Sequence, residues 1–125
     1  WVAERKPSLD LASAMGADFQ ASLTASALKL LQRTKAPIAI TCHDQRRLKW
    51  SGRSRDFSAD FYILNELHQD TVAFDMAFGA VKGLGRPKRE SASRWLSGPG
   101  VYRMEVWSQS IRLPEGSVLS MLVVT

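Results

Sequence analysis

The chain has 125 residues, enough for one domain with a hydrophobic core and too few for two domains of ordinary size. Hydrophobic residues make up 45% of it and charged residues 23%, an ordinary balance for a globular protein. No apolar run approaches the roughly 18 residues of a membrane span. The single cysteine excludes an intramolecular disulfide framework, and the formal net charge of +5 permits an acidic partner.

These properties favour a protein of a reducing compartment, so we expect a cytoplasmic location and no membrane partner. The chain begins with Trp1, and no signal-peptide pattern follows it. We therefore expect the chain to be a fragment of a longer one.

A helical hairpin is predicted over residues 8–35. Ser8 is a candidate N-cap of the first helix, Ser22 caps a second helix that runs to Arg33, and Pro37 prevents any continuation. Apolar residues recur at every third or fourth position, as on one face of a helix: Leu11, Met15 and Phe19, then Leu23, Ala27, Leu30 and Leu31. Two helices joined by a turn also form the outline of a DNA-binding unit, but a hairpin packed on a sheet is the simpler interpretation.

A β-hairpin is predicted next, with its first strand at Ile38–His43 and a tight turn at Asp44 and Gln45. In the second strand Leu48 and Trp50 stand two residues apart, so they face the same side. We expect that side to face inward and Trp50 to be largely buried.

Six further elements follow. They are a short apolar strand at Phe61–Leu64, a helix at 70–81 capped by Asp70, a basic Gly/Pro linker at 83–90, a helical turn at 91–96 that anchors Trp95, a strand that begins at Tyr102, and a strand at Val118–Val124 after a turn at 114–117. The last run is almost continuously apolar, which is typical of a central strand covered on both faces.

The predicted fold class is α+β. An N-terminal helix pair is followed by a four- to five-stranded, mostly antiparallel sheet with a crossing helix, and the helices are expected on one face. We expect a single domain over residues 1–125, with the helical hairpin at 8–35 and the sheet, with helix 70–81, at 36–125.

Residues suited to catalysis are sparse. No His-Glu-x-x-His motif is present, and the spacing of Glu66, His68 and Asp70 is not a usual zinc geometry, so a surface turn is the simpler interpretation. Cys42 and His43 are adjacent on a predicted strand and therefore point to opposite faces, which prevents them from acting as a dyad. We predict no catalytic residue, no metal and no cofactor for this chain.

The basic residues fall in two groups. Five of the 17 Lys and Arg residues lie at positions 46–55, and another five lie at positions 82–94. If the hairpin and the linker lay side by side, they would form one positive patch to which nucleic acid could bind weakly; the simpler alternative is a solvated strand face and a linker. The residues of this alternative nucleic-acid site are Lys29, Arg46, Arg47, Lys49, Arg86, Lys88 and Arg89.

Three stretches share their pattern with a known family. The first is Ser-Leu-Thr-Ala-Ser-Ala at positions 22–27; the second contains Asp44, Trp50, Arg53, Ser54, Asp56 and Phe57; the third is Ser-Ala-Ser-Arg-Trp-Leu-Ser-Gly at positions 91–98. They resemble the C-terminal, post-catalytic region of the ImmA/IrrE-type zinc metallopeptidases, a bacterial family of regulatory proteases. Gln45 and Ser91 depart from the turn glycine and the proline of the family pattern.

The resemblance implies a non-catalytic regulatory, sensor or interaction domain of a metallopeptidase that acts in transcriptional or stress regulation. Its expected partners are the N-terminal peptidase region of the same parent chain and a regulator protein or small ligand, with DNA as a weak partner at most. The zinc ligands of such proteins precede this region, so no catalytic residue is carried over.

The central site is predicted at Trp50, Arg53, Arg55 and Asp56, where Arg53 offers a forked donor to a carboxylate or phosphate and Asp56 orients it. A structural salt bridge between Arg53 and Asp56 is the alternative. Two other classes of function remain open: a nucleic-acid-binding module that uses the helix pair and the basic patch, and a small-molecule sensor with a pocket between sheet and helix.

Overall fold

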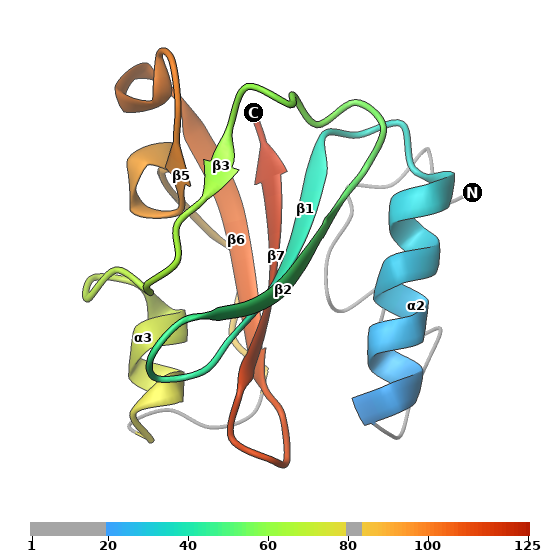
Figure 1. The fold of residues 1–125 in the computed structure, drawn as a ribbon, viewed down its shortest axis with the longest axis vertical. Helices are drawn as coiled ribbons and strands as arrows, with labels where there is room; N and C mark the ends of the chain where they lie inside the picture. Colours follow the sequence, from blue (N-terminus) through green and yellow to red (C-terminus); the bar gives the residue numbers. More distant parts are fainter. Residues whose placement is uncertain (1–19, 80–83) are drawn as a thin grey trace.

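The structure, a computed structural model, describes residues 20–79 and 84–125. In this part of the chain an antiparallel sheet lies between helix α2 (Gln20–Arg33) on one face and helix α3 (Val72–Ala77) on the other (Figure 1). The first helix of the predicted pair falls outside the described residues. Among the described residues, no helix is long and apolar enough to cross a membrane.

The sheet has five strands in the order β2-β1-β7-β6-β4. They are β1 (Ile38–His43), β2 (Leu48–Arg53), β4 (Lys88–Ser91), β6 (Glu105–Arg112) and β7 (Val118–Val124). A second sheet pairs β3 (Tyr62–Ile63) with β5 (Leu96–Ser97), and short 3₁₀ helices lie at Ala92–Arg94 and Val101–Arg103. The predicted α+β class with an antiparallel sheet is confirmed.

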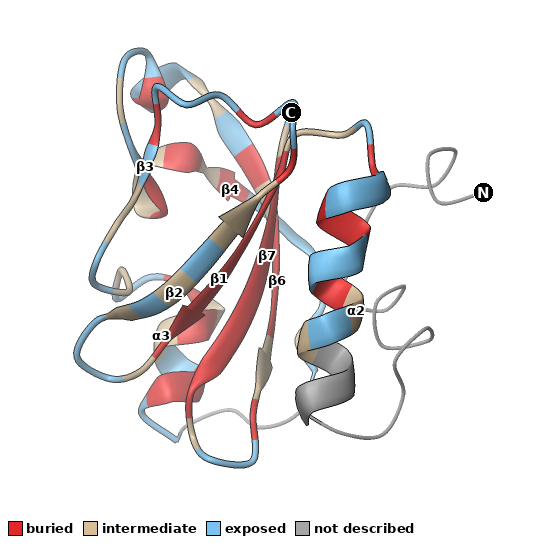
Figure 2. Cartoon of the chain, turned by 45° about the vertical axis from the view of Figure 1, so that its right-hand side comes forward, coloured by how far each residue is buried: buried red, intermediate tan, exposed pale blue. Residues whose placement is uncertain are grey.

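The sheet is apolar on both faces. Ile38 and Ile40 of β1 pack in the core that contains α2, whereas Ala39 packs in the core that contains α3. Central strand β7 supplies both cores and is buried from Val118 to Val123, as its apolar run predicted (Figure 2). The expectation of helices on one face alone is wrong, because central strands that are apolar on both sides need a cover on each.

Helix α3 is shorter than the predicted helix at 70–81, and its N-cap is Thr71 rather than Asp70. The Thr71 Oγ1 atom accepts a hydrogen bond from the Phe74 amide at 3.2 Å. The helix ends at Ala77, and Gly79 then adopts the left-handed conformation, with a φ of 84°. Glycine reaches this conformation without steric cost, so Gly79 is a natural stop signal.

The connection between β1 and β2 is a four-residue loop, residues 44–47, and not the predicted two-residue turn. The Asp44 Oδ1 atom accepts hydrogen bonds from the backbone amides of Arg46 at 2.7 Å and Arg47 at 2.8 Å. These two amides hold the pKa of the Asp44 carboxyl below its usual value. The strand pairing also shifts between Cys42 and His43, so strict alternation does not extend to the start of β2.

The predicted linker at 83–90 is a strand in its second half. Strand β4 pairs with β6 and forms one edge of the sheet, while β2 forms the other. The strand expected to begin at Tyr102 begins instead at Glu105, because Gly100, with a φ of 75°, leads into a 3₁₀ helix that leaves Tyr102 exposed. Charged β4 lacks the apolar alternation by which a strand is recognised, and charge of this kind protects sheet edges.

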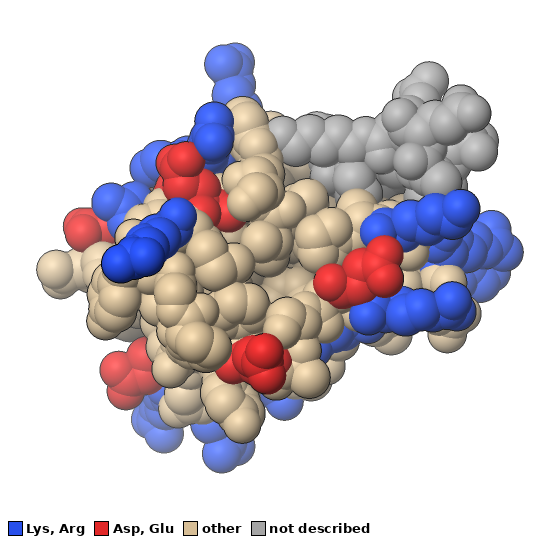
Figure 3. Space-filling model, turned by 90° about the horizontal axis from the view of Figure 1, so that it is seen from above, with Lys and Arg blue, Asp and Glu red and all other residues tan. Residues whose placement is uncertain are grey.

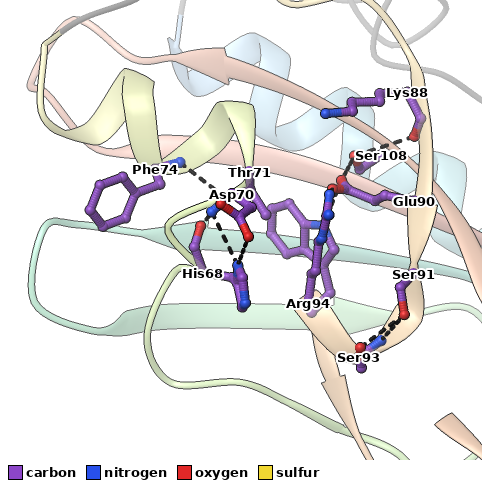
Figure 4. A network of polar contacts seen from close by, with 11 residues as sticks. His68, Asp70, Thr71, Phe74, Lys88, Glu90, Ser91, Ser93, Arg94 and Ser108 are labelled. Atoms are coloured by element: carbon purple, nitrogen blue, oxygen red, sulfur yellow. Dashed lines mark hydrogen bonds and ion pairs between the residues drawn. The ribbon is translucent and has the colours of Figure 1, made fainter. Parts of the chain in front are cut away.

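The predicted helical turn around Trp95 is confirmed. Trp95 is 3% exposed, and its indole Nε1 donates to the Glu90 carboxylate at 2.9 Å. The same buried carboxylate accepts from the Ser108 hydroxyl and from Arg94 Nη1 at 3.3 Å (Figure 4). Glu90 therefore ties the edge strand β4 to β6 and to the 3₁₀ helix that precedes Trp95.

Candidate binding cleft beside helix α2

The structure separates the four residues of the predicted central site. Trp50 lies on β2 and packs inward toward α2, as predicted, but it is partly rather than fully buried because β2 is an edge strand. Arg53 pairs with Ala39 and lies on the opposite face, where it covers the Phe57 ring at 5.2 Å and donates to the Ser58 carbonyl at 3.2 Å.

Among the described residues, Arg53 forms no ion pair with Asp56. The guanidinium is instead engaged by the aromatic ring and the carbonyl that follow it in the chain. The structural salt bridge considered as the alternative is therefore not formed, and Asp56 is exposed.

Arg55 and Asp56 do come together, in a cleft of about 330 Å³ between the end of α2 and the segment that leaves β2. The other walls of this cleft are Gln32, Arg33, Thr34 and Lys35. Because these residues are about 20 positions apart in the sequence, the cleft depends on the packing of α2 against the start of the hairpin.

Ser54 holds the β2 side of the cleft in place. Its amide donates to the Ile38 carbonyl at 2.8 Å, and its Oγ atom accepts from the Ile38 amide at 2.8 Å and donates to the Ala36 carbonyl at 2.7 Å. Ser54 is 4% exposed, so these bonds form away from water. They tie the residue before Arg55 to the chain just after Lys35, which fixes both cations beside the same cleft.

The α2 side is anchored equally closely. The Thr34 amide continues the helix by donating to the Leu30 carbonyl at 2.9 Å, and the Thr34 Oγ1 atom accepts from the Ala36 amide at 3.1 Å. A Cβ atom added at Gly52 would lie 2.8 Å from Leu31 Cδ1, so the glycine allows α2 to lie close against β2. The cleft is thus built on buried, hydrogen-bonded residues although its rim is exposed.

The cleft is positively charged. Arg33, Lys35 and Arg55 are exposed, Asp56 is the one carboxylate among its walls, and no ion pair within the described residues neutralises the three cations. Figure 3 looks down on the end of the molecule where α2 ends and shows Lys and Arg side chains gathered on its right, with an acidic side chain among them. Arg33 complements the negative end of the helix dipole, but Lys35 and Arg55 have no such local role.

The alternative nucleic-acid residues do not form one patch. Arg46, Arg47 and Lys49 belong to the β1–β2 hairpin, whereas Arg86, Lys88 and Arg89 lie in or before β4 at the opposite edge of the sheet. Three strands separate the two edges, so the condition for one positive patch, a hairpin and a linker side by side, is not met. Two of the cations are also paired, Lys49 with Glu115 at 3.5 Å and Arg89 with Glu105 at 3.0 Å, while Lys29 is exposed on α2.

Cys42 and His43 point to opposite faces, as predicted, and form no dyad. Cys42 lies in the α2-side core, where burial raises the pKa of its thiol. His43 is buried on the other face, where Nε2 lies 3.0 Å from the Leu64 carbonyl and burial lowers the pKa of the ring. The described residues contain no group of three or more His, Cys, Asp or Glu that could hold a metal ion.

Sequence reasoning found Arg55 and Asp56 but missed Arg33, Lys35 and the supporting Ser54. The two missed cations follow directly on a helix, where a terminal cation is expected without any binding role. No protein-family model matches this chain, and no curated protein matches it.

Proposed function

We propose that this chain is a non-catalytic regulatory or interaction domain that binds an acidic segment of a protein partner in the cleft beside α2. The observation that carries the proposal is the gathering of three exposed cations, which have no ion-pair partner among residues 20–79 and 84–125, around a cleft whose framework is buried and hydrogen-bonded. Because the backbone that carries these Lys and Arg residues is already fixed by hydrogen bonds, the binding of a carboxylate costs less conformational entropy.

The parent protein on this proposal is a cytoplasmic bacterial metallopeptidase-like regulator of the ImmA/IrrE type. One of the residues that carry the resemblance, Ser54, supports the cleft as well, since its hydrogen bonds to Ala36 and Ile38 join the two sides. The acidic segment would come from the peptidase region of the same parent chain or from the regulator on which the peptidase acts.

The test is an NMR titration of the ¹⁵N-labelled chain with a hexaglutamate peptide. We expect saturable shifts confined to residues 32–35 and 54–57, weakened by added salt because the contacts are exposed. Arg55→Glu should abolish them, and Arg103→Glu, which reverses an exposed arginine of the 3₁₀ helix at Val101–Arg103, should leave them unchanged. Shifts that survive Arg55→Glu, or no shifts at all, would contradict the proposal.

A titration with duplex DNA in place of hexaglutamate tests the alternative function of nucleic-acid binding. With its cations divided between two sheet edges, the chain should bind duplex DNA weakly, with steep salt dependence and without sequence preference. A selective complex of nanomolar affinity at physiological salt would favour the nucleic-acid function over the one proposed.

A further inference from the structure

The β1–β2 loop divides two adjacent hollows at the other end of the hairpin from the cleft beside α2. One, of about 390 Å³, lies between this loop and the β6–β7 turn; the other, of about 380 Å³, lies between the loop and α3. Gln45 and Arg46 line both hollows, so a ligand of moderate size that crosses the loop would meet both.

The loop that separates the hollows is held at both ends. The Gln45 side-chain amide donates to the Ala77 carbonyl, the last of α3, at 2.9 Å, and Asp44 is bonded to the amides of Arg46 and Arg47. The Asp44 amide also donates to the Arg47 carbonyl at 3.0 Å. The loop therefore presents the Arg46 side chain from a fixed backbone, which lowers the entropic cost of binding.

Two arginines line the first hollow. Arg112 is half-buried and Arg46 is exposed, and within the described residues neither guanidinium has an ion-pair partner. The carboxylates in the same hollow are already engaged: Asp44 accepts from backbone amides, and Glu115 pairs with Lys49 and accepts from the Ser117 hydroxyl. A half-buried guanidinium without a carboxylate favours an anionic group of a ligand.

The second hollow offers an aromatic surface. The rings of Phe74 and Phe78 lie 4.6 Å apart between centroids, and Phe78 is 52% exposed although it is large and apolar. Leu67 adds to this apolar wall, and Glu66 on the same wall repels an anion. A ligand would therefore place its ring against Phe78 and its anionic group toward Arg46 and Arg112.

We infer that these two hollows form one binding site for a small aromatic anion, in which Arg46 and Arg112 hold the anionic group and Phe74 and Phe78 hold the ring. The site is independent of the cleft proposed for the acidic protein segment, since the two share no residue.

The experiment compares two fluorescent probes of similar size, 1-anilinonaphthalene-8-sulfonate, which carries a sulfonate, and N-phenyl-1-naphthylamine, which does not. We expect the folded chain to bind the anionic probe more tightly than the neutral one. Arg46→Gln and Arg112→Gln should each lower the affinity for the anionic probe about tenfold, because each removes one charge-assisted contact. Neither substitution should change the affinity for the neutral probe. Phe78→Ser, at an exposed position, should weaken both.

Arg55→Gln is the matched control, since it removes a cation of the other cleft and should affect neither probe. Circular dichroism checks that Arg112→Gln is folded. If that variant does not fold, Arg46→Gln, which lies in an exposed loop, still tests whether an arginine holds the anionic group. Equal affinity of the two probes, or anionic-probe binding that is unchanged in Arg46→Gln, would overturn the inference while leaving the hexaglutamate result untouched.

Discussion

The two sides of the sheet are stabilised in different ways. On the α2 side the core is aliphatic, with Leu30, Ile40 and Leu119 fully buried around a single helix. On the α3 side the buried residues include many polar ones: Thr41, His43, Glu90, Ser108, Ser110 and Ser120. Both sides bury apolar area, and the second adds directed hydrogen bonds between segments far apart in the chain, such as those that Glu90 accepts from Trp95 and Ser108.

The largest expected effect is on the α2 side. Leu30→Ala should lower the free energy of unfolding by about 3–4 kcal/mol, since Leu30 is fully buried and the sheet cannot collapse into the space it leaves. Lys29→Ala, at the adjacent exposed position, should change it by less than about 0.5 kcal/mol. Urea denaturation measures both, and equal effects would mean that α2 does not pack as the structure shows.

On the α3 side the matching test is Glu90→Ala. We expect a loss of about 3 kcal/mol in the free energy of unfolding, because the indole of Trp95 and the hydroxyl of Ser108 lose a buried charged acceptor. Glu105→Ala removes a carboxylate of the paired strand whose partner Arg89 is exposed, and should cost less than about 1 kcal/mol. If Glu90→Ala were as stable as Glu105→Ala, the hydrogen-bonded account of this side would fail.

Ser54 lies where the edge strand β2 leaves the sheet, and its removal should have a smaller effect. Ser54→Ala leaves the Ile38 amide and the Ala36 carbonyl without their partner, which should cost about 2 kcal/mol. Ser51→Ala, at an exposed position of the same strand, is the control. The urea concentrations at the midpoint of unfolding are compared for the two variants. Equal midpoints would mean that Ser54 does not stabilise the framework of the cleft.

The smallest expected effect is a pH dependence that is specific to the α3 side. Burial lowers the pKa of His43 in the folded state, so the unfolded chain takes up a proton first as the pH falls. Stability is therefore retained above about pH 6.5 and decreases below it, by no more than about 1.4 kcal/mol per pH unit for one proton. His43→Gln should flatten this slope in urea denaturation measured between about pH 5 and pH 8; a slope that persists in His43→Gln would point to another group.

The same contrast explains what the sequence could predict. Helix α2, strands β1 and β7 and the turn that buries Trp95 follow from local patterns, namely the spacing of Ala27, Leu30 and Leu31 and the continuous apolar run of β7. Strand β4 has no such pattern, because most of its residues are charged. Its pairing with β6 is supported by the buried Glu90, which accepts a hydrogen bond from Ser108 of β6. The helix at 70–81 was predicted, but its place on the face opposite α2 was not, because the periodicity of a helix does not show which face of a sheet it covers.

The cleft shows the same division. Arg55 and Asp56 were singled out because three charges crowd before Phe57, which is a local feature. Arg33 and Lys35 join them only because α2 packs over Gly52 and Ser54 binds Ala36 and Ile38, and these contacts link residues about 20 positions apart. Arg53 was misplaced since the alternation of β2 turns it away from the cleft, toward the face that Ala39 occupies.

The most direct test of the central claim, that the cations of the cleft serve binding rather than stability, is the hexaglutamate titration of the Lys35→Gln/Arg55→Gln variant. Both side chains are exposed and unpaired within the described residues, so the variant should unfold within about 1 kcal/mol of the parent chain. We predict that it is folded and shows none of the shifts at residues 32–35 and 54–57 that the parent shows. A variant that binds hexaglutamate as the parent does would contradict the account.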